Sequence, residues 1–241
     1  MRMSAGNDNR HYLICESKMI YALLMFAAGM MGAYTYVMRG GVFCNAQTAN
    51  IVIMGITLGK GEIREGLYYL IPISAYFLGA FLSELLPTPV KRIGFLRWDT
   101  YLIIFEAAVL LVIGFVPLSV PDHAVQVAVN FIASMQYNTF RQAQGVPMAT
   151  TFCTNHLRQV GIACAKVLRK KDYEAVSRGL LHLGMLFVFA LGCGILTFFC
   201  AWLQEKAIWL ALIPMGIVLV RLVYADLCKE HDLLGEKPSG H

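Results

Sequence analysis

The run GLLHLGMLFVFALGCGILTFFCAWL, residues 179–203, decides the fold class, because it contains no lysine, arginine, aspartate or glutamate. A helix that crosses a bilayer needs about 20 mostly apolar residues. Five further runs have this character, at approximately 19–38, 66–86, 100–118, 121–140 and 207–227. Lipid offers no hydrogen-bond partners to an open backbone, so each run should be helical. The sequence predicts an all-α, polytopic transmembrane helix bundle with six long spans.

The composition of the whole chain points to the same class. Of its 241 residues, 58% are hydrophobic and 15% are charged, whereas soluble domains carry about 25% charged residues. This excludes an ordinary cytosolic enzyme and a disordered chain. The net charge of +5 comes from basic residues in short loops, which is typical of orientation in a membrane. We therefore expect membrane lipid as a partner and no nucleic acid.

The sequence lacks the signatures of a metal site, a cofactor site or a familiar active site. Its seven cysteines form no C-x-x-C pair, and most lie in apolar runs, where a free cysteine acts as a small packing residue. The chain contains no G-x-S-x-G, H-E-x-x-H, Walker A or G-x-G-x-x-G pattern. We expect no enzyme activity, no metal, no cofactor and no transport driven by ATP.

Two stretches, 42–59 and 147–168, each join a polar first half to a short apolar second half. Each is either a short broken or re-entrant segment or a full span that faces the bundle interior. With six spans and a cytoplasmic N-terminus, 16 of the 20 lysines and arginines lie inside; with eight spans, 13 do. The positive-inside rule thus favours six spans, multi-pass, with eight spans as the alternative.

The two polar stretches resemble each other. GGVFCNAQTAN at 40–50 and GVPMATTFCTN at 145–155 align with a shift of 105 residues, which matches Gly40 to Gly145 and Asn50 to Asn155. The sequence predicts one membrane domain, 1–241, with repeat halves at about 19–118 and 121–227 and polar tails at 1–17 and 229–241. Three spans per half would make an inverted repeat, as in many transporters, and four would make a parallel one. Chance recurrence of small polar residues is the alternative.

The candidate solute-binding residues lie in these two stretches. Polar groups at membrane depth need partners, a water-filled cavity or a ligand. Two helix N-termini facing one site would attract an anion or a polar oxygen, and an arginine would suit an oxyanion. Helix capping and bonds between helices are the alternative explanation. The candidates are Asn45, Gln47, Thr48, Asn50, Thr151, Thr154, Asn155, His156 and Arg158.

Glu106 interrupts the apolar run TYLIIFEAAVLLVIGF. An acidic residue inside a span is costly, so it should face the bundle interior and have a partner. Arg158, His182 and Arg221 are the candidate partners. Glu106 is a candidate proton-coupling group, and a structural ion pair near the headgroups is the alternative.

GGVFCNAQTANIVIMG after an apolar helix, followed by MQYNTFRQAQGVPMATTFCTNHLRQ, resembles the YoaK-like family of bacterial inner-membrane proteins, a domain of unknown function. The resemblance covers roughly 19–225. It implies a multi-pass protein of the bacterial inner (cytoplasmic) membrane, with a transporter as the presumed activity. Our first hypothesis is a secondary transporter or facilitated pore for a small polar or anionic solute. A non-transporting scaffold or sensor with a partner is the alternative, and size leads us to expect a homodimer.

Overall fold

The computed structural model describes residues 12–92, 94–170, 173–236 and 238, and this part of the chain is almost entirely helical. The main helices are α1 (Lys18–Met38), α2 (Gln47–Gly59), α3 (Ile63–Tyr68), α4 (Leu70–Leu85), α5 (Pro87–Lys91), α6 (Trp98–Ile113), α7 (Asp122–Thr139), α8 (Cys153–Lys170), α9 (Tyr173–Leu203) and α10 (Leu212–Tyr224). Short turns of other helix types are η1 (Ile14–Glu16), η2 (Gln204–Ala211), η3 (Ala225–Lys229) and η4 (His231–Leu233). The all-helical class is confirmed, and each of the six apolar runs contains a helix.

Among the described residues, three stretches are long and apolar enough to cross a membrane: Lys18–Met38, Ile63–Lys91 and Glu174–Lys229. The last of them contains both α9 and α10. α6 has 16 residues, which is short for a span, and α7 carries several amide, hydroxyl and charged or titratable side chains among its apolar residues. The six-span arrangement therefore stays a prediction.

Two prolines explain why long helices are interrupted. Proline has no N–H to donate to the carbonyl four residues earlier. Pro72 leaves the carbonyl of Tyr68 without this bond, and the chain breaks between α3 and α4 at Tyr69. Pro214 does the same to Leu210, and there η2 changes into α10. Both breaks follow directly from the sequence.

The bundle is organised by two extensive helix pairings, α1 with α9 and α4 with α7. Both crossings are close because they use glycine. A methyl group on Gly29 would overlap the carbonyl oxygen of Phe189, and one on Gly192 would overlap that of Phe26. In the other pair, a methyl group on Gly79 would overlap the carbonyl oxygen of Phe131. Small residues let backbones approach this closely, as is typical of helix packing in membranes.

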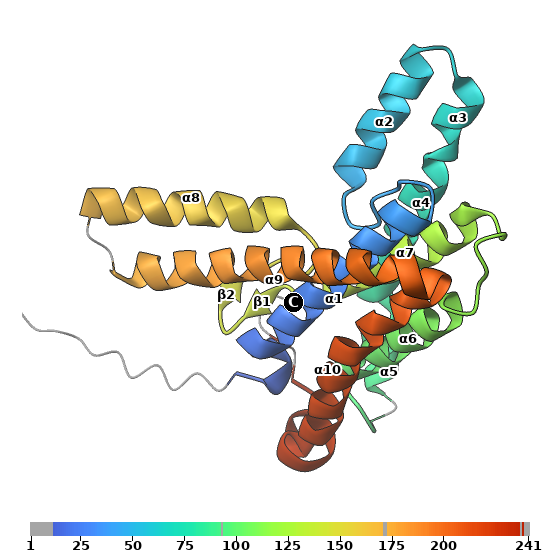
Figure 1. Ribbon diagram of the computed structural model, residues 1–241. Helices are drawn as coiled ribbons and strands as arrows, with labels where there is room; N and C mark the ends of the chain where they lie inside the picture. The colour runs from blue at the N-terminus through green and yellow to red at the C-terminus, as the bar shows by residue number, and fades with distance from the viewer. Residues whose placement is uncertain (1–11, 93, 171–172, 237, 239–241) are drawn as a thin grey trace, which may run out of the picture.

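Two helical hairpins project from this bundle (Figure 1). α2 packs on α3, and α8 lies alongside the first half of α9. The two polar stretches of the sequence lead into α2 and α8: residues 39–46 and 148–152 are non-helical. Both stretches are thus broken segments followed by a helix, and α8, with 18 residues, is longer than the short apolar half that the sequence predicts.

The all-α prediction overlooks one small β-hairpin, β1 (Gln142–Ala143) with β2 (Val146–Pro147). Its two turn residues, Gln144 and Gly145, both have positive φ, at 49° and 76°. This is the requirement of a type I′ turn, which the twist of a two-residue hairpin favours. The hairpin turns the chain between α7 and α8.

Part of each predicted polar tail is folded. The backbone N–H of Ile14 donates to Glu230 Oε1 at 2.7 Å, and both Glu16 and Glu230 are buried. Arg97, also buried, donates from its side chain to Asp99 Oδ1 at 3.3 Å and to the carbonyl of Leu233 at 3.2 Å. These contacts hold the segments around Ile14 and Leu233 near the start of α6.

We predict that Gly192→Ala lowers the free energy of unfolding by about 1–3 kcal/mol, because the new methyl group must push α1 away from α9. The matched control is Gly194→Ala, since a methyl group there meets no atom within 4 Å. Thermal unfolding of the purified protein in detergent measures both. Equal stability of the two variants would contradict the close crossing.

Candidate functional site

The first polar stretch forms a small hydrogen-bonded network at the start of α2. Gln47 Nε2 donates to Asn130 Oδ1 on α7 at 2.6 Å. Asn50, fully buried, donates to the carbonyl of Phe43 at 3.0 Å and to Gln47 Oε1 at 3.2 Å. Its Oδ1 is buried without a partner. This network joins α2 to α7 and leaves one acceptor unused.

The other two candidates of this stretch lie apart from the network. Asn45 is buried, with its Nδ2 3.4 Å from the carbonyl oxygen of Ala28 on α1, and it packs directly on Gly32. Thr48 is exposed. Asn45 is therefore part of the packing between α1 and the chain before α2.

The second polar stretch divides between the interior and the surface. Thr151 and its neighbour Thr150 are buried, and the hydroxyl of each lacks a partner. Thr154 is exposed. Arg158 is also exposed and donates to Asn155 Oδ1 at 3.0 Å, so the predicted fixed charge does not reach the centre of the bundle.

His156 is fully buried and belongs to a pair that the sequence does not reveal. Its Nδ1 lies 2.9 Å from Nδ1 of His182 on α9, and its Nε2 lies 2.8 Å from the carbonyl oxygen of Ala149. Histidines 26 residues apart carry no pairing signal in the sequence. Only the antiparallel packing of α8 on α9 brings them together.

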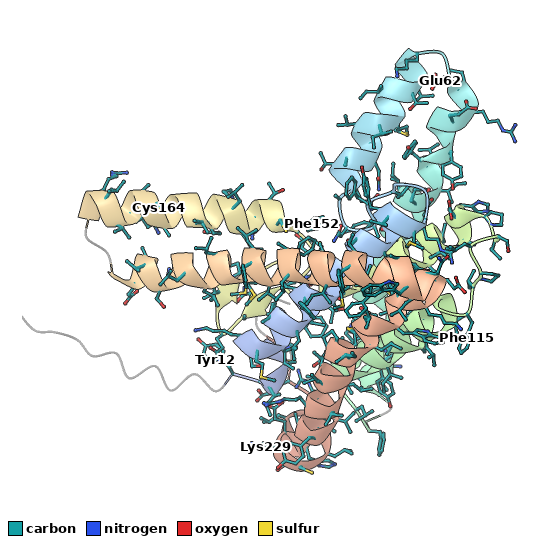
Figure 2. The ribbon with its side chains drawn as sticks, viewed as in Figure 1. Tyr12, Glu62, Phe115, Phe152, Cys164 and Lys229 are labelled. Carbon is teal, nitrogen blue, oxygen red and sulfur yellow. The ribbon has the colours of Figure 1, made fainter. Side chains whose placement is uncertain are left out.

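Both polar stretches approach the middle of α9. Cys44, just before α2, and Cys153, at the start of α8, both lie near Cys193 of α9. Cys193 itself donates to the carbonyl of Gly29 at 3.1 Å. The two stretches therefore converge beside the α1–α9 crossing, although no hydrogen bond between described residues joins Asn45–Asn50 to Thr151–Arg158. Figure 2 marks Phe152 at this end of α8.

Glu106 is the most unusual polar residue of the bundle. It lies near the middle of α6, its side chain is fully buried, and neither carboxylate oxygen has a hydrogen-bond partner. None of its predicted partners pairs with it: Arg158 and Arg221 are exposed, and His182 bonds to His156. The expectation of an ion pair is corrected, and Glu106 stays an unpaired buried acid.

Further unsatisfied groups lie in the interior, and our set of candidates omits them. Gln136 on α7 is fully buried with both its oxygen and its nitrogen unpaired, and the hydroxyl of Tyr76 on α4 is buried without a partner. An amide near the end of an apolar run was the available signal for Gln136. Nothing in the sequence distinguishes Tyr76 from an interfacial tyrosine.

Arg39 at the end of α1, in contrast, is fully buried and well paired. Its guanidinium donates to the carbonyls of Val116 and Pro117 at 2.5 and 3.2 Å, and it lies 3.9 Å from Asp122. A charge buried among carbonyl acceptors stabilises a fixed geometry. We read Arg39 as a structural link between α1 and the α6–α7 loop.

The described residues contain no group of three or more His, Cys, Asp or Glu side chains that could hold a metal ion. Their buried polar side chains include amides, hydroxyls, imidazoles, the paired guanidinium groups of Arg39 and Arg97, and the unpaired carboxyl of Glu106. These groups can hydrogen-bond a small polar solute.

We predict a coupling energy of about 0.6–1.7 kcal/mol between Gln47 and Asn130 in a double-mutant cycle with alanine, as for buried hydrogen bonds between membrane helices. The control cycle uses Asn155 and Arg158, whose bond is exposed to solvent and should couple by less than about 0.5 kcal/mol. Chemical or thermal unfolding supplies the four stabilities of each cycle. A coupling no larger than that of the control would refute the contact.

Comparison with known proteins assigns the chain to a family. No curated protein matches the chain, and no protein of solved structure matches it. Residues 20–221 match the family described as "Protein of unknown function (DUF1275)". This match covers α1 to α10 with both polar stretches, and the chain therefore belongs to the DUF1275 family.

Proposed function

We propose that this chain is a secondary transporter or facilitated pore for a small polar or anionic solute. The observation that carries the proposal is the set of buried polar atoms without partners. Inside a membrane each such atom is costly, and it persists where it lines a solute pathway or a binding site. The atoms belong to Asn50, Tyr76, Asp99, Glu106, Gln136, Thr150, Thr151 and Asp226.

The proposal includes the internal repeat, and helix crossings support it. Phe26 presents its carbonyl oxygen to Gly192, and Phe131 presents its own to Gly79. The two phenylalanines are 105 residues apart, the same shift that aligns the two polar stretches, and the two glycines are 113 apart. In the six-span arrangement each half would thus pack its first span on the second span of the other half, α1 on α9 and α7 on α4.

The two projecting hairpins show the same spacing of equivalent residues. Leu58 on α2 contacts Gly66 on α3, and Ala163 on α8 contacts Gly179 on α9. Leu58 and Ala163 are again 105 residues apart, and the glycines are again 113 apart. Six spans would place such halves in opposite orientations, which is the arrangement of inverted-repeat transporters.

The resemblance to YoaK-like proteins favours the bacterial inner membrane as the location. The exposed basic residues Arg158, Lys166 and Arg169 of α8 lie in the segment that the six-span arrangement assigns to the cytoplasm. We take the N-terminus as cytoplasmic on the same grounds.

A non-transporting scaffold or sensor is the second candidate, and one observation favours it. The described cavities lie elsewhere: none of the five is lined by Glu106 or Gln136. Buried polar groups without a cavity fit a transporter that is closed on both sides of the membrane, and they equally fit a protein whose helices only pack together. A measurement of solute flux across a membrane distinguishes the two.

The six-span arrangement predicts that a cysteine at Arg92, which is exposed after α5, is modified by a membrane-impermeant maleimide only from the cytoplasmic side. A cysteine at Lys60, exposed between α2 and α3, should react only from the opposite side. Both variants are best made in a background without the native exposed cysteines, Cys164 and Cys228. Labelling of both positions from one side would contradict six spans.

We predict that Glu106→Gln abolishes uptake of the transported solute into proteoliposomes while the protein stays folded. Because the buried carboxyl has no partner, Glu106→Leu should raise the free energy of unfolding by about 1–3 kcal/mol. The matched control is Glu65→Gln on the exposed face of α3, which should change neither quantity. Uptake that is unchanged in Glu106→Gln would remove Glu106 from the mechanism.

A further inference from the structure

A polar cavity of about 430 Å³ lies outside the bundle centre, between α8, α9 and the β-hairpin. This volume is in the range of small-molecule sites. Two basic residues line it, Lys166 from α8 and Arg178 from α9. Among the lining residues the one acidic side chain is Glu174, whose carboxylate lies 3.5 Å from Arg178 in an exposed ion pair. The cavity is therefore open to an anion of modest size.

His182 lines this cavity, and the hydrogen bonds of the histidine pair show where its protons lie. Nε2 of His156 lies 2.8 Å from a carbonyl oxygen, which can only accept, so this nitrogen carries hydrogen. The neutral ring of His156 then has an acceptor at Nδ1. Nδ1 of His182, at 2.9 Å, must donate to it. Nε2 of His182 is left as an unprotonated acceptor.

This arrangement can take up one proton without losing a bond. A proton on Nε2 of His182 gives an imidazolium whose Nδ1–H still donates to His156. A second proton would place two N–H groups face to face across 2.9 Å, so the pair accepts only one. The histidine pair thus works as a single base whose free nitrogen belongs to a residue that lines the cavity.

Burial of the His182 ring and the charges near it together determine when that proton is held. Lys166 and Arg178 oppose a further positive charge, Glu174 favours it, and the remaining titratable neighbours in the cavity and the pair are Tyr12 and His156. A bound oxyanion would reverse the balance, because it offsets both basic side chains. Anion binding and proton uptake then favour each other equally, as linkage requires.

We propose that this cavity binds a small oxyanion, a carboxylate or a phosphate-like group, together with one proton at Nε2 of His182. None of the residues that line the cavity carries one of the partnerless polar atoms of the bundle. Binding to it is measurable whether or not the chain carries a solute, so this proposal and the proposed function fail separately.

Isothermal titration of the purified full chain with sulfate and with oxalate tests the proposal, since neither probe titrates between pH 6 and 8. Above the pH at which the free pair loses its proton, affinity should fall tenfold for each pH unit, the signature of one linked proton. Tighter binding of sulfate would identify a phosphate-like ligand, and tighter binding of oxalate a carboxylate. Binding that does not depend on pH, or no binding of either probe at millimolar concentration, overturns the proposal.

Three variants separate the roles. His182→Asn can still donate to His156 but cannot take up a proton, so the pH dependence should disappear. Lys166→Ala with Arg178→Ala should weaken binding at least tenfold, and both side chains are exposed at the cavity, so folding is not at risk. Arg169→Ala, an exposed charge on α8 that does not line the cavity, is the control. Equal weakening by Arg169→Ala, or an unchanged pH dependence in His182→Asn, contradicts the assignment.

Discussion

The close crossing of α1 and α9 through facing glycines is the contact on which the rest of the structure depends. Gly29 and Gly192 each lie against a carbonyl oxygen of the opposite helix, with no room for a side chain. The crossing brings Cys193 of α9 to the backbone of α1, and both polar stretches approach Cys193. The α4–α7 crossing at Gly79 repeats the geometry. The close approach of the α1 and α9 backbones thus determines where the two polar stretches of the chain lie.

The buried polar residues differ in how well they are satisfied, and this difference separates scaffold from candidate site. Arg39 and Arg97, at the ends of α1 and α6, direct their donors at main-chain carbonyls and nearby carboxylates. Glu106 and Gln136, inside the bundle, have no partner on any side-chain polar atom. A protein that needed these two only for packing would do better with leucine, because an unpaired buried polar group costs stability. Their presence without partners is the physical reason to look for a solute there.

The sequence predicts the helices well because apolar length is a strong local signal. The run at 179–203 lies entirely inside α9, and Pro72 and Pro214 mark helix breaks. The β-hairpin is missed because its turn uses Gln144 at positive φ, a conformation that glutamine rarely adopts. Helix ends are less certain, since α9 begins several residues before its apolar run.

The candidate site is only partly predictable, because pairing depends on tertiary packing. Asn50 and Thr151 are buried as expected, and Gln47 finds its partner on α7. Arg158, however, follows His156 by two positions on α8, which places the two side chains on different faces of the helix. His156 turns inward to His182, and Arg158 faces outward. A sequence pattern locates such residues on a helix but does not say which face is covered.

The central claim is that the unpaired polar groups of the bundle bind a solute. The most direct test is the thermal stability of the purified protein against a panel of small anions, amino acids and sugars, in the Lys166→Ala/Arg178→Ala background so that the α8–α9 cavity does not contribute. A solute well above its Kd should stabilise the protein by about 3 kcal/mol. Our account predicts a selective shift that disappears in Gln136→Leu. No shift with any solute, together with a Gln136→Leu protein that is simply more stable, would contradict it.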